Sequence, residues 1–444
     1  MSDLSQPAFT ARRGQAAGLS QPIGLLDLGS SKFCCLIVGP AGKDQRAPRT
    51  QQHSSDKHGN SGATILASAY TQSAGIRCGA VVDMPAAEAA VRSCVAQAEA
   101  EAGLQIRDVH LAINGCNLMA RVFAAHADVS GAVVTPQDVA RAHQAGRAYA
   151  ERDGRRLIDF QQIGVKLDSV ACDQDPIGLA ARRITVELFS VTCDQPTLQN
   201  FATLLQRSHL NLAAYTAAPI VSAMAVTSEN ERDLGITVAN IGAQTINVTL
   251  FVHGHPLQLA SATTGSAILT RDIAVAFETT LAEAERIKSL YGTLARAESD
   301  QQTRFDYVSG EGAHQRLETA TVAELADVIL PGANALLDMT WELIEETGLA
   351  DAAGRRIVLT GGGAQALGIA SHAADRFGLP VRVGVPTVGE ADTTPLALPG
   401  SSVVAGLINT AARFADPRVS DQHQKRDQSE QFAWRVGRWL MAAR

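Results

Sequence analysis

Two short turns combine glycine, small and hydroxyl residues in a way that suits the binding of phosphate. The first turn is Gly29-Ser30-Ser31-Lys32, within the segment Ile23–Ile37, and the second is Gly242-Ala243-Gln244-Thr245, within the segment Leu234–Phe251. Each segment predicts a β-hairpin whose turn exposes backbone N–H groups. Such turns form concave anion sites, and Lys32 adds a cation that can neutralise part of a phosphate. Either turn alone is more often an ordinary hairpin, so the pair together carries the prediction.

A third glycine turn lies further along the chain. A strand pattern ends in Gly361-Gly362-Gly363-Ala364, and a helical pattern follows through Arg376. Glycines at this place let a ligand approach the backbone, and the start of the following helix favours anions or ribose hydroxyls. The segment has neither the Lys-Ser/Thr pair of a Walker A motif nor the spacing of a GxGxxG motif. The three turns together predict a nucleotide site.

The composition sets limits on the class of protein. The chain has 444 residues and a formal net charge of −7, which argues against a general nucleic-acid binder. Its seven cysteines show no zinc-ligand spacing, so we expect reduced thiols. The first 21 residues are polar, and no apolar run approaches the roughly 20 residues of a membrane span. We therefore expect a cytoplasmic protein.

The order of strand and helix patterns predicts an α/β fold of two similar halves with a cleft between them, where ligands bind as loops converge. Residues 116–192 form a smaller α/β unit inside the first half. The polar stretch Leu294–Gly312 is expected to be a loop. The helix predicted over Thr321–Thr347 is expected to break at Pro331.

These features resemble the actin/Hsp70/sugar-kinase ATPase superfamily and, within it, the FtsA family of bacterial cell-division proteins. The resemblance runs from about Ile23 to Phe414. Outside the turns it rests on four segments, which are Gly79-Ala80-Val81-Val82-Asp83, Asp175-Pro176-Ile177-Gly178, Leu281–Lys288 and Phe377–Gly384. It implies an actin-like (ribonuclease H-like) two-domain ATPase fold with an inserted 1C-type subdomain in the first half.

The resemblance also implies the domain boundaries. The parts are a flexible tail (1–20), a first half (21–115 and 193–215) with a disordered loop at 40–62, an inserted subdomain (116–192), a second half (216–415) whose smaller subdomain spans about 270–350, a linker (416–431) and a terminal helix (432–444).

The resemblance implies a site for ATP and Mg²⁺. The residues that it places against the nucleotide are Asp27, Gly29, Ser30, Ser31, Lys32, Gly242, Ala243, Gln244, Thr245, Glu283, Lys288, Gly361, Gly362, Gly363 and Ala364. Asp27 would hold the metal through water, and Asn240 is the second candidate at the metal. A solvated helix face is the alternative interpretation for Glu283 and Lys288.

The second turn departs from the superfamily pattern Asp-x-Gly-Gly-Gly-Thr-x-Asp. Its acids are replaced by Asn240 and Asn247, and its second and third glycines by Ala243 and Gln244. An amide is a poorer magnesium partner than a carboxylate and polarises an attacking water less. We therefore expect ATP binding with slow or absent hydrolysis, and we assign no catalytic residue.

The last residues predict an amphipathic helix that lies on a membrane. At about 100° per residue the apolar side chains share one face and two arginines lie on the other. The residues assigned to the membrane contact are Phe432, Arg435, Val436, Arg438, Trp439 and Leu440. Aromatic groups at the headgroup level and arginines toward anionic lipid are typical of such a helix. Packing of this helix on the protein's own body is the alternative.

The family resemblance implies the partners. These are the C-terminal tail of FtsZ, further copies of the chain in head-to-tail filaments, an anionic membrane surface and other division proteins, with no nucleic acid. The expected location is the inner face of the cell membrane at the division site. In the family, an arginine directly after the position of Pro331 meets the acidic FtsZ peptide, whereas this chain has Gly332. An actin-like pilus-assembly adaptor and a sugar or acyl kinase stay open as alternatives.

Overall fold

The computed structural model describes residues 21–40, 63–115, 117–310, 312–386 and 396–415. The predicted tail, the inserted loop after Pro40, the linker and the terminal helix lie outside the described residues. Among the described helices, none is long and apolar enough to cross a membrane.

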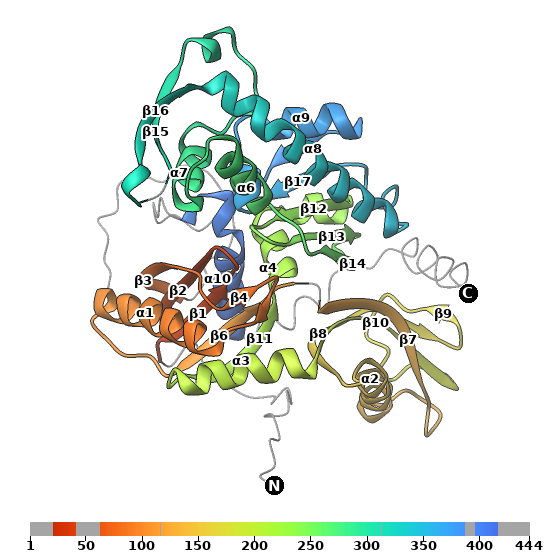
Figure 1. Cartoon of the computed structure of the whole chain (residues 1–444). Coiled ribbons are helices and arrows are strands. Elements are labelled where there is room, and N and C mark those ends of the chain that lie inside the picture. Colours follow the sequence, from red (N-terminus) through yellow and green to blue (C-terminus); the bar gives the residue numbers. More distant parts are fainter. Residues whose placement is uncertain (1–20, 41–62, 116, 311, 387–395, 416–444) are drawn as a thin grey trace, which may run out of the picture.

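Two five-stranded sheets share one strand order, as the spacing of the two hairpins suggests (Figure 1). In each sheet three antiparallel strands are followed by two parallel ones. The order is β3-β2-β1-β6-β11 in the first half and β14-β13-β12-β17-β18 in the second. The strands of the first sheet are β1 (Ile23–Leu28), β2 (Lys32–Pro40), β3 (Ala63–Gln72), β6 (Asp108–Ile113) and β11 (Asn211–Ala217). Those of the second are β12 (Ile236–Ile241), β13 (Ile246–Val252), β14 (His255–Ala262), β17 (Ile357–Thr360) and β18 (Val381–Val383).

The central strands are buried on both faces because helices cover both. Strand β12 is buried along its whole length, and β1 at every position except Asp27, which matches their nearly unbroken apolar sequence. Helices α1 (Met84–Ala102) and α3 (Gln195–Arg207) cover the outer face of the first sheet (Figure 1).

Helices α4 (Ala218–Ala225) and α10 (Ser402–Ala415) pack between the two sheets. On one side, Leu407 of α10 packs in the same cluster as Leu25 and Leu36 of the first sheet. On the other side, Ala223 of α4 packs with Val238 of the second sheet. The inner face of the first sheet is therefore closed by a helix that lies almost four hundred residues later in the chain.

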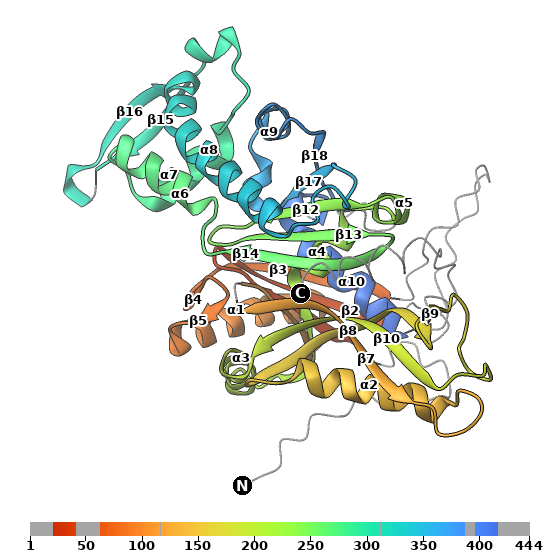
Figure 2. The same ribbon diagram turned by 90° about the vertical axis from the view of Figure 1, so that its right-hand side faces the viewer.

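The inserted unit is a four-stranded sheet in the order β7-β10-β8-β9, with helix α2 (Pro136–Ala150) on one face. Its strands are β7 (Leu118–Asp128), β8 (Arg155–Leu167), β9 (Val170–Ala171) and β10 (Arg183–Asp194). Helix α2 begins with a capping box, in which Thr135 and Asp138 satisfy each other's backbone N–H groups. The unit lies beside both main sheets on the side away from α7, β15 and β16 (Figures 1 and 2).

The second half carries a smaller group of elements, α6 (Ala267–Ala276), α7 (Leu281–Tyr291), the hairpin β15 (Arg304–Ser309) and β16 (Arg316–Thr321), and α8 (Val322–Glu346). The expected loop at 294–312 is partly wrong, because it contains strand β15. There Phe305 stacks on Tyr291 and contacts Phe277, and this aromatic packing fixes a segment whose sequence is mostly polar. A short hairpin, β4 (Ile76–Arg77) and β5 (Ala80–Val81), precedes α1 in the first half.

Helix α8 also differs from expectation, because it runs through Pro331 without a break. One apolar face along the helix is buried, and this burial outweighs the single backbone hydrogen bond that proline cannot make. The neighbouring Gly332 is buried against α6. A Cβ atom at this position would lie 2.7 Å from side-chain atoms of Leu269 and Asp272. The described helices are completed by α5 (Glu229–Asp233) and α9 (Ile369–Phe377).

Candidate functional site

A cleft of about 830 Å³ opens between the two halves and is lined by all three predicted turns. Such a volume suits a small-molecule ligand the size of a nucleotide. The sequence-predicted residues that line it are Asp27, Gly29, Ser30, Ser31, Lys32, Asn240, Gly242, Ala243, Gln244, Thr245, Lys288, Gly361, Gly362 and Gly363. Two do not line it, namely Glu283 and the buried Ala364.

The first turn joins β1 to β2 and presents one carboxylate and one cation to the cleft. The N–H of Gly29 donates to the carbonyl of Lys32 over 3.2 Å and closes the turn. The ammonium of Lys32 stands 5.2 Å from the centre of the Tyr70 ring. Burial raises the pKa of Asp27 to about 6, and Lys32 limits that rise. A desolvated carboxylate of this kind gains from a cation beside it.

The residues near Asp27 fit a magnesium ion that keeps most of its water. No group of three or more His, Cys, Asp or Glu side chains gathers as a metal site among the described residues. Magnesium needs only one or two carboxylates when phosphates supply further ligands. The amide nitrogen of Asn240 donates to Ser222 Oγ over 2.8 Å, so Asn240 could offer a metal only its neutral amide oxygen, which is a poorer magnesium ligand than a carboxylate. Asp27 is therefore the better of the two candidates for the metal.

The second turn joins β12 to β13 and holds the start of α6. The N–H of Gly242 donates to the carbonyl of Thr245 over 2.8 Å, and the N–H groups of Ser266 and Ala267 donate to the carbonyls of Gly242 and Ala243. The close approach requires glycine at 265, where a Cβ atom would lie 2.5 Å from the carbonyl oxygen of Gly242. The turn and the first turn of α6 thus form one rigid unit.

Two side chains of the second hairpin reach across to the first half. The amide oxygen of Gln244 accepts a 3.2 Å hydrogen bond from the N–H of Cys78, in the β4–β5 turn. The amide nitrogen of Asn247 donates to Asn114 Oδ1 over 2.9 Å. These are positions where the superfamily pattern has glycine and aspartate, so the departures from that pattern create contacts between the halves.

The glycine turn after β17 has one open position. At Gly361 the φ angle is +88°, and a Cβ atom would lie 2.4 Å from Asn240 Oδ1. At Gly363 it would lie 2.5 Å from Ile241 Cγ2. At Gly362 no atom lies within 4 Å of a Cβ position. The outer glycines are required by packing, whereas Gly362 leaves room for a ligand.

Helix α7 turns a different acid to the cleft than the sequence predicted. Glu285 and Lys288 both line the cleft and pair over 2.7 Å, and Thr270 Oγ1 hydrogen-bonds to both side chains. Glu283 instead binds Arg286 with both carboxylate oxygens, outside the cleft. Helical spacing could have revealed this arrangement, because residues 281, 285 and 288 share one face and residue 283 does not.

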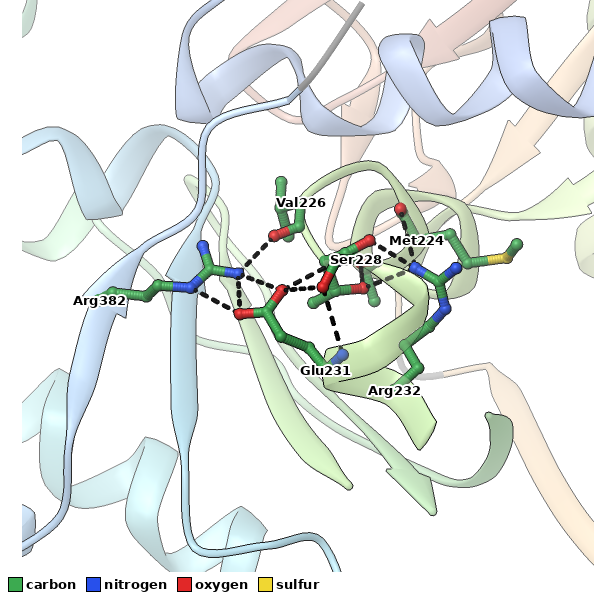
Figure 3. Close-up of polar contacts among 8 residues, drawn as sticks. Met224, Val226, Ser228, Glu231, Arg232 and Arg382 are labelled. Carbon is green, nitrogen blue, oxygen red and sulfur yellow. Dashed lines mark hydrogen bonds and ion pairs between the residues drawn. The ribbon is translucent and has the colours of Figure 1, made fainter. Parts of the chain in front are cut away.

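A cluster of polar contacts surrounds the end of α4 (Figure 3). Arg382 donates to the carbonyl of Val226 over 2.9 Å and to both oxygens of Glu231, and Arg232 donates to the carbonyls of Met224 and Thr227. The last carbonyls of a helix lack partners within it, so these arginines cap α4.

Helix α4 carries Ser222, which is fully buried. Its Oγ lies 2.8 Å from Ser402 Oγ at the start of α10, and it accepts the hydrogen bond from Asn240 described above. Asn240, which lines the cleft, is thereby joined through Ser222 to both helices that separate the sheets.

Comparison with known proteins identifies the family. The family model described as "Cell division protein FtsA" matches residues 237–406, and the model described as "SHS2 domain inserted in FTSA" matches residues 117–192. Together they match more than half of the chain. The chain belongs to the FtsA family.

FtsA proteins of other bacteria are similar to this chain over most of its length. The cell division protein FtsA of Rhizobium meliloti (strain 1021) is 25% identical over 435 residues, covering 95% of this chain and 94% of that protein. FtsA of Escherichia coli (strain K12) is 27% identical over 345 residues, covering 76% of this chain and 81% of that protein. The FtsA match decides among the alternatives that the sequence left open, against a sugar or acyl kinase and against a pilus adaptor.

Solved structures support the actin-like fold. The PilM-PilN type IV pilus biogenesis complex aligns with a TM-score of 0.59 at 19% identity, covering 87% of this chain and 97% of that chain. MreB5 of Spiroplasma citri bound to ADP aligns with a TM-score of 0.50 at 14% identity, covering 89% of this chain and 98% of that chain. This chain therefore has the actin-like ATPase fold with an SHS2 insertion in its first half, as the sequence predicts.

Proposed function

We propose that this FtsA family member binds ATP with Mg²⁺ in the cleft between its halves. The observation that carries the proposal is the meeting of three glycine-containing turns, from both halves, on one cleft of suitable volume. Backbone N–H groups and Lys32 suit the phosphates. Glu285 and Lys288 offer an acceptor and a donor for ribose hydroxyls, and Gly362 leaves space for the base.

Bound magnesium would neutralise phosphate charge, with Asp27 holding it through water. Hydrolysis should be slow or absent, because few groups in the cleft can act as a base. Among the described residues that line it, the carboxylates belong to Asp27 and Glu285. The amides of Asn114 and Asn240 cannot take a proton from an attacking water. ATP would then serve mainly as a ligand that stabilises the assembled state, in which copies of the chain join head to tail.

Calorimetry on the full chain tests the nucleotide site. Replacing Gly362 with phenylalanine should lower the affinity for ATP and Mg²⁺ at least roughly tenfold, because the ring fills open space in the cleft without straining the backbone. Gly131→Phe is the matched control, since Gly131 also has no atom within 4 Å of its Cβ position but lies in the inserted unit. Equal ATP affinity in both variants would contradict the assignment.

We also propose that the chain tethers FtsZ filaments to the inner face of the cell membrane at the division site. The tether would be the amphipathic segment 432–444, which lies outside the described residues. Deleting this segment should release the protein from anionic vesicles, and Trp439→Glu should have nearly the same effect because it forces a charge into the interface. The truncated protein floating with vesicles would exclude this segment as the anchor.

The proposed FtsZ contact lies on the part of the second half that contains α8. In the family, an arginine at the position of Gly332 meets the acidic FtsZ peptide. In this chain Gly332 is packed against α6, so the position faces the chain's own helix. An arginine there would first displace the side chains of Leu269 and Asp272. We therefore expect Gly332→Arg to disturb the α6–α8 packing without strengthening the binding of an acidic FtsZ tail peptide. Co-sedimentation with FtsZ tests the partner itself. Tighter binding of the peptide by the Gly332→Arg variant would contradict this expectation and would indicate that an arginine at position 332 can reach the peptide.

A further inference from the structure

Two cations line the cleft, one from each half, and neither forms an ion pair with a described residue. Lys32 comes from the first half and Arg271, on α6, from the second, and both side chains belong to exposed residues that line the cleft. Neither makes a hydrogen bond or an ion pair with any described residue, although Lys32 lies over the Tyr70 ring. By contrast, Lys288 and Arg286 on neighbouring α7 are both paired with glutamates.

The acid next to Arg271 does not compensate its charge. Asp272 turns toward α8, where its carboxylate oxygen lies 2.7 Å from the position of a Cβ atom on Gly332. Among the described residues, Arg271 is thus left without an acidic partner at the wall of the cleft. An uncompensated guanidinium of this kind, opposite a second cation, suits a polyanion.

The position of Arg271 follows from the anchoring of α6. The N–H of Ala267 donates to the carbonyl of Ala243 in the second turn over 2.8 Å. Arg271 follows four residues later on the same helix face, so its Cβ lies roughly 5–6 Å along the helix from that of Ala267. The long side chain therefore stands one helical turn above the second phosphate turn.

The second turn itself leaves donors for the same anion. The carbonyls of Gly242 and Ala243 are taken by the N–H groups of α6, whereas the N–H groups of Ala243 and Gln244 donate no hydrogen bond within the described residues. Free N–H groups below and a guanidinium above define an anion position on the wall of the second half.

We propose that Arg271 binds the terminal phosphates of a nucleoside triphosphate from the second half, opposite Lys32, and so makes the cleft selective for triphosphates over monophosphates. This inference rests on the proposed nucleotide function and adds a residue to it. The planar guanidinium can donate two parallel hydrogen bonds to one phosphate, which the ammonium of lysine cannot do.

Calorimetry on the full chain with Mg²⁺ tests the proposal, with ATP, AMP and inorganic tripolyphosphate as probes. Arg271→Ala should weaken ATP and tripolyphosphate roughly tenfold or more, because a charge-assisted hydrogen bond to phosphate is lost, while AMP affinity stays within about twofold. The affinity of Arg271→Lys for ATP and tripolyphosphate should lie between those of the wild type and Arg271→Ala. Arg316→Ala is the matched control, since Arg316 is exposed on β16 and does not line the cleft.

The outcomes separate this proposal from the nucleotide function. An equal loss of ATP and AMP affinity in Arg271→Ala, or no loss of either, would overturn the role of Arg271. A wild-type chain that binds tripolyphosphate through Arg271 but binds no ATP would support the anion position and refute the nucleotide function. A wild-type chain that binds neither probe would refute both.

Discussion

Replacing Asn247 with aspartate, the residue of the superfamily pattern, should destabilise this protein. The Asn247 side chain is 2% exposed. Its amide nitrogen donates to Asn114 Oδ1 over 2.9 Å, and its oxygen accepts from Ser261 Oγ over 2.8 Å. The Asn114 oxygen also accepts from the N–H of Gly115 over 2.8 Å, so it cannot turn away easily. An aspartate would set a charged oxygen against this carbonyl oxygen.

The size of the loss follows from these contacts. The amide nitrogen of Asn247 donates to Asn114 Oδ1 and, over 3.4 Å, to Thr245 Oγ1. A carboxylate can make neither bond as a donor, at about 0.5–1.5 kcal/mol for the stronger one, and the buried charge gains no cation. Removing one partner of a buried ion pair costs about 3–5 kcal/mol. Because Ser261 still donates to the carboxylate, we expect the free energy of unfolding of Asn247→Asp to be about 3 kcal/mol lower than that of the wild type at pH 8.

The stability that Asn247→Asp loses should increase as the pH rises. A protonated aspartate can donate to Asn114 Oδ1 as asparagine does, so the folded state raises the pKa of Asp at this position above its unfolded value of about 3.9. A cost of about 3 kcal/mol corresponds to about two pKa units, which sets the folded pKa near about 6. The variant should match the wild type below about pH 4 and lose stability as pH rises through about 6.

Urea unfolding of the full chain at several pH values measures this difference. Asn200→Asp, at an exposed position of α3, serves as the control for adding one charge. A deficit that is the same at pH 4 and pH 8, or no deficit at pH 8, would refute the reasoning. Either result would mean that the site accepts a carboxylate and that Asn114 reorients.

Other predictions concern the supports of the site and its turnover. Arg382→Met should lower the free energy of unfolding by about 1–2 kcal/mol at pH 7, a modest value because the ion pair is half-exposed. Burial raises the pKa of Glu231, but the hydrogen bonds from Ser228 and Arg382 together outweigh burial, so the pKa is lowered in the folded state. The stability that this pair adds is therefore present above the unfolded pKa and lost as pH falls through the folded one, so urea titrations of the variant and wild type should converge in acid. Gly361→Ala should destabilise by more than about 1 kcal/mol because of its φ of +88°, whereas Gly362→Ala should not, and equal unfolding midpoints would contradict the packing argument. ATP turnover should stay below about 1 per second, the lower end of the usual enzyme range. A faster rate in a phosphate-release assay would contradict the inference that few groups in the cleft can act as a base.

Local patterns predicted the hairpins and most helices, because alternating or unbroken apolar runs and glycine turns are signals carried by neighbouring residues. Helix α8 was misjudged at Pro331, since its continuity depends on burial against other elements. The sequence pattern pointed to Glu283, whereas Glu285 lines the cleft, because residues 285 and 288 share the face of α7 that is turned to the cleft and residue 283 does not. The bond from Cys78 to Gln244 joins residues 166 positions apart, and no local pattern records such a contact.

The closing of the first sheet by α10 has a consequence for the order in which the protein takes shape on the ribosome. The cluster that contains Leu25, Leu36 and Val38 is completed by Val403, Val404 and Leu407. At about 5–20 residues per second, the ribosome needs roughly 20–70 s to add the chain between Val38 and Val403. The inserted unit, by contrast, is continuous from β7 to β10, and the helix that covers one face of its sheet lies within it. During synthesis, the first strands of the protein therefore keep an apolar face exposed until α10 is made. An exposed face of this kind can associate with other chains, which is the kind of surface that chaperones bind.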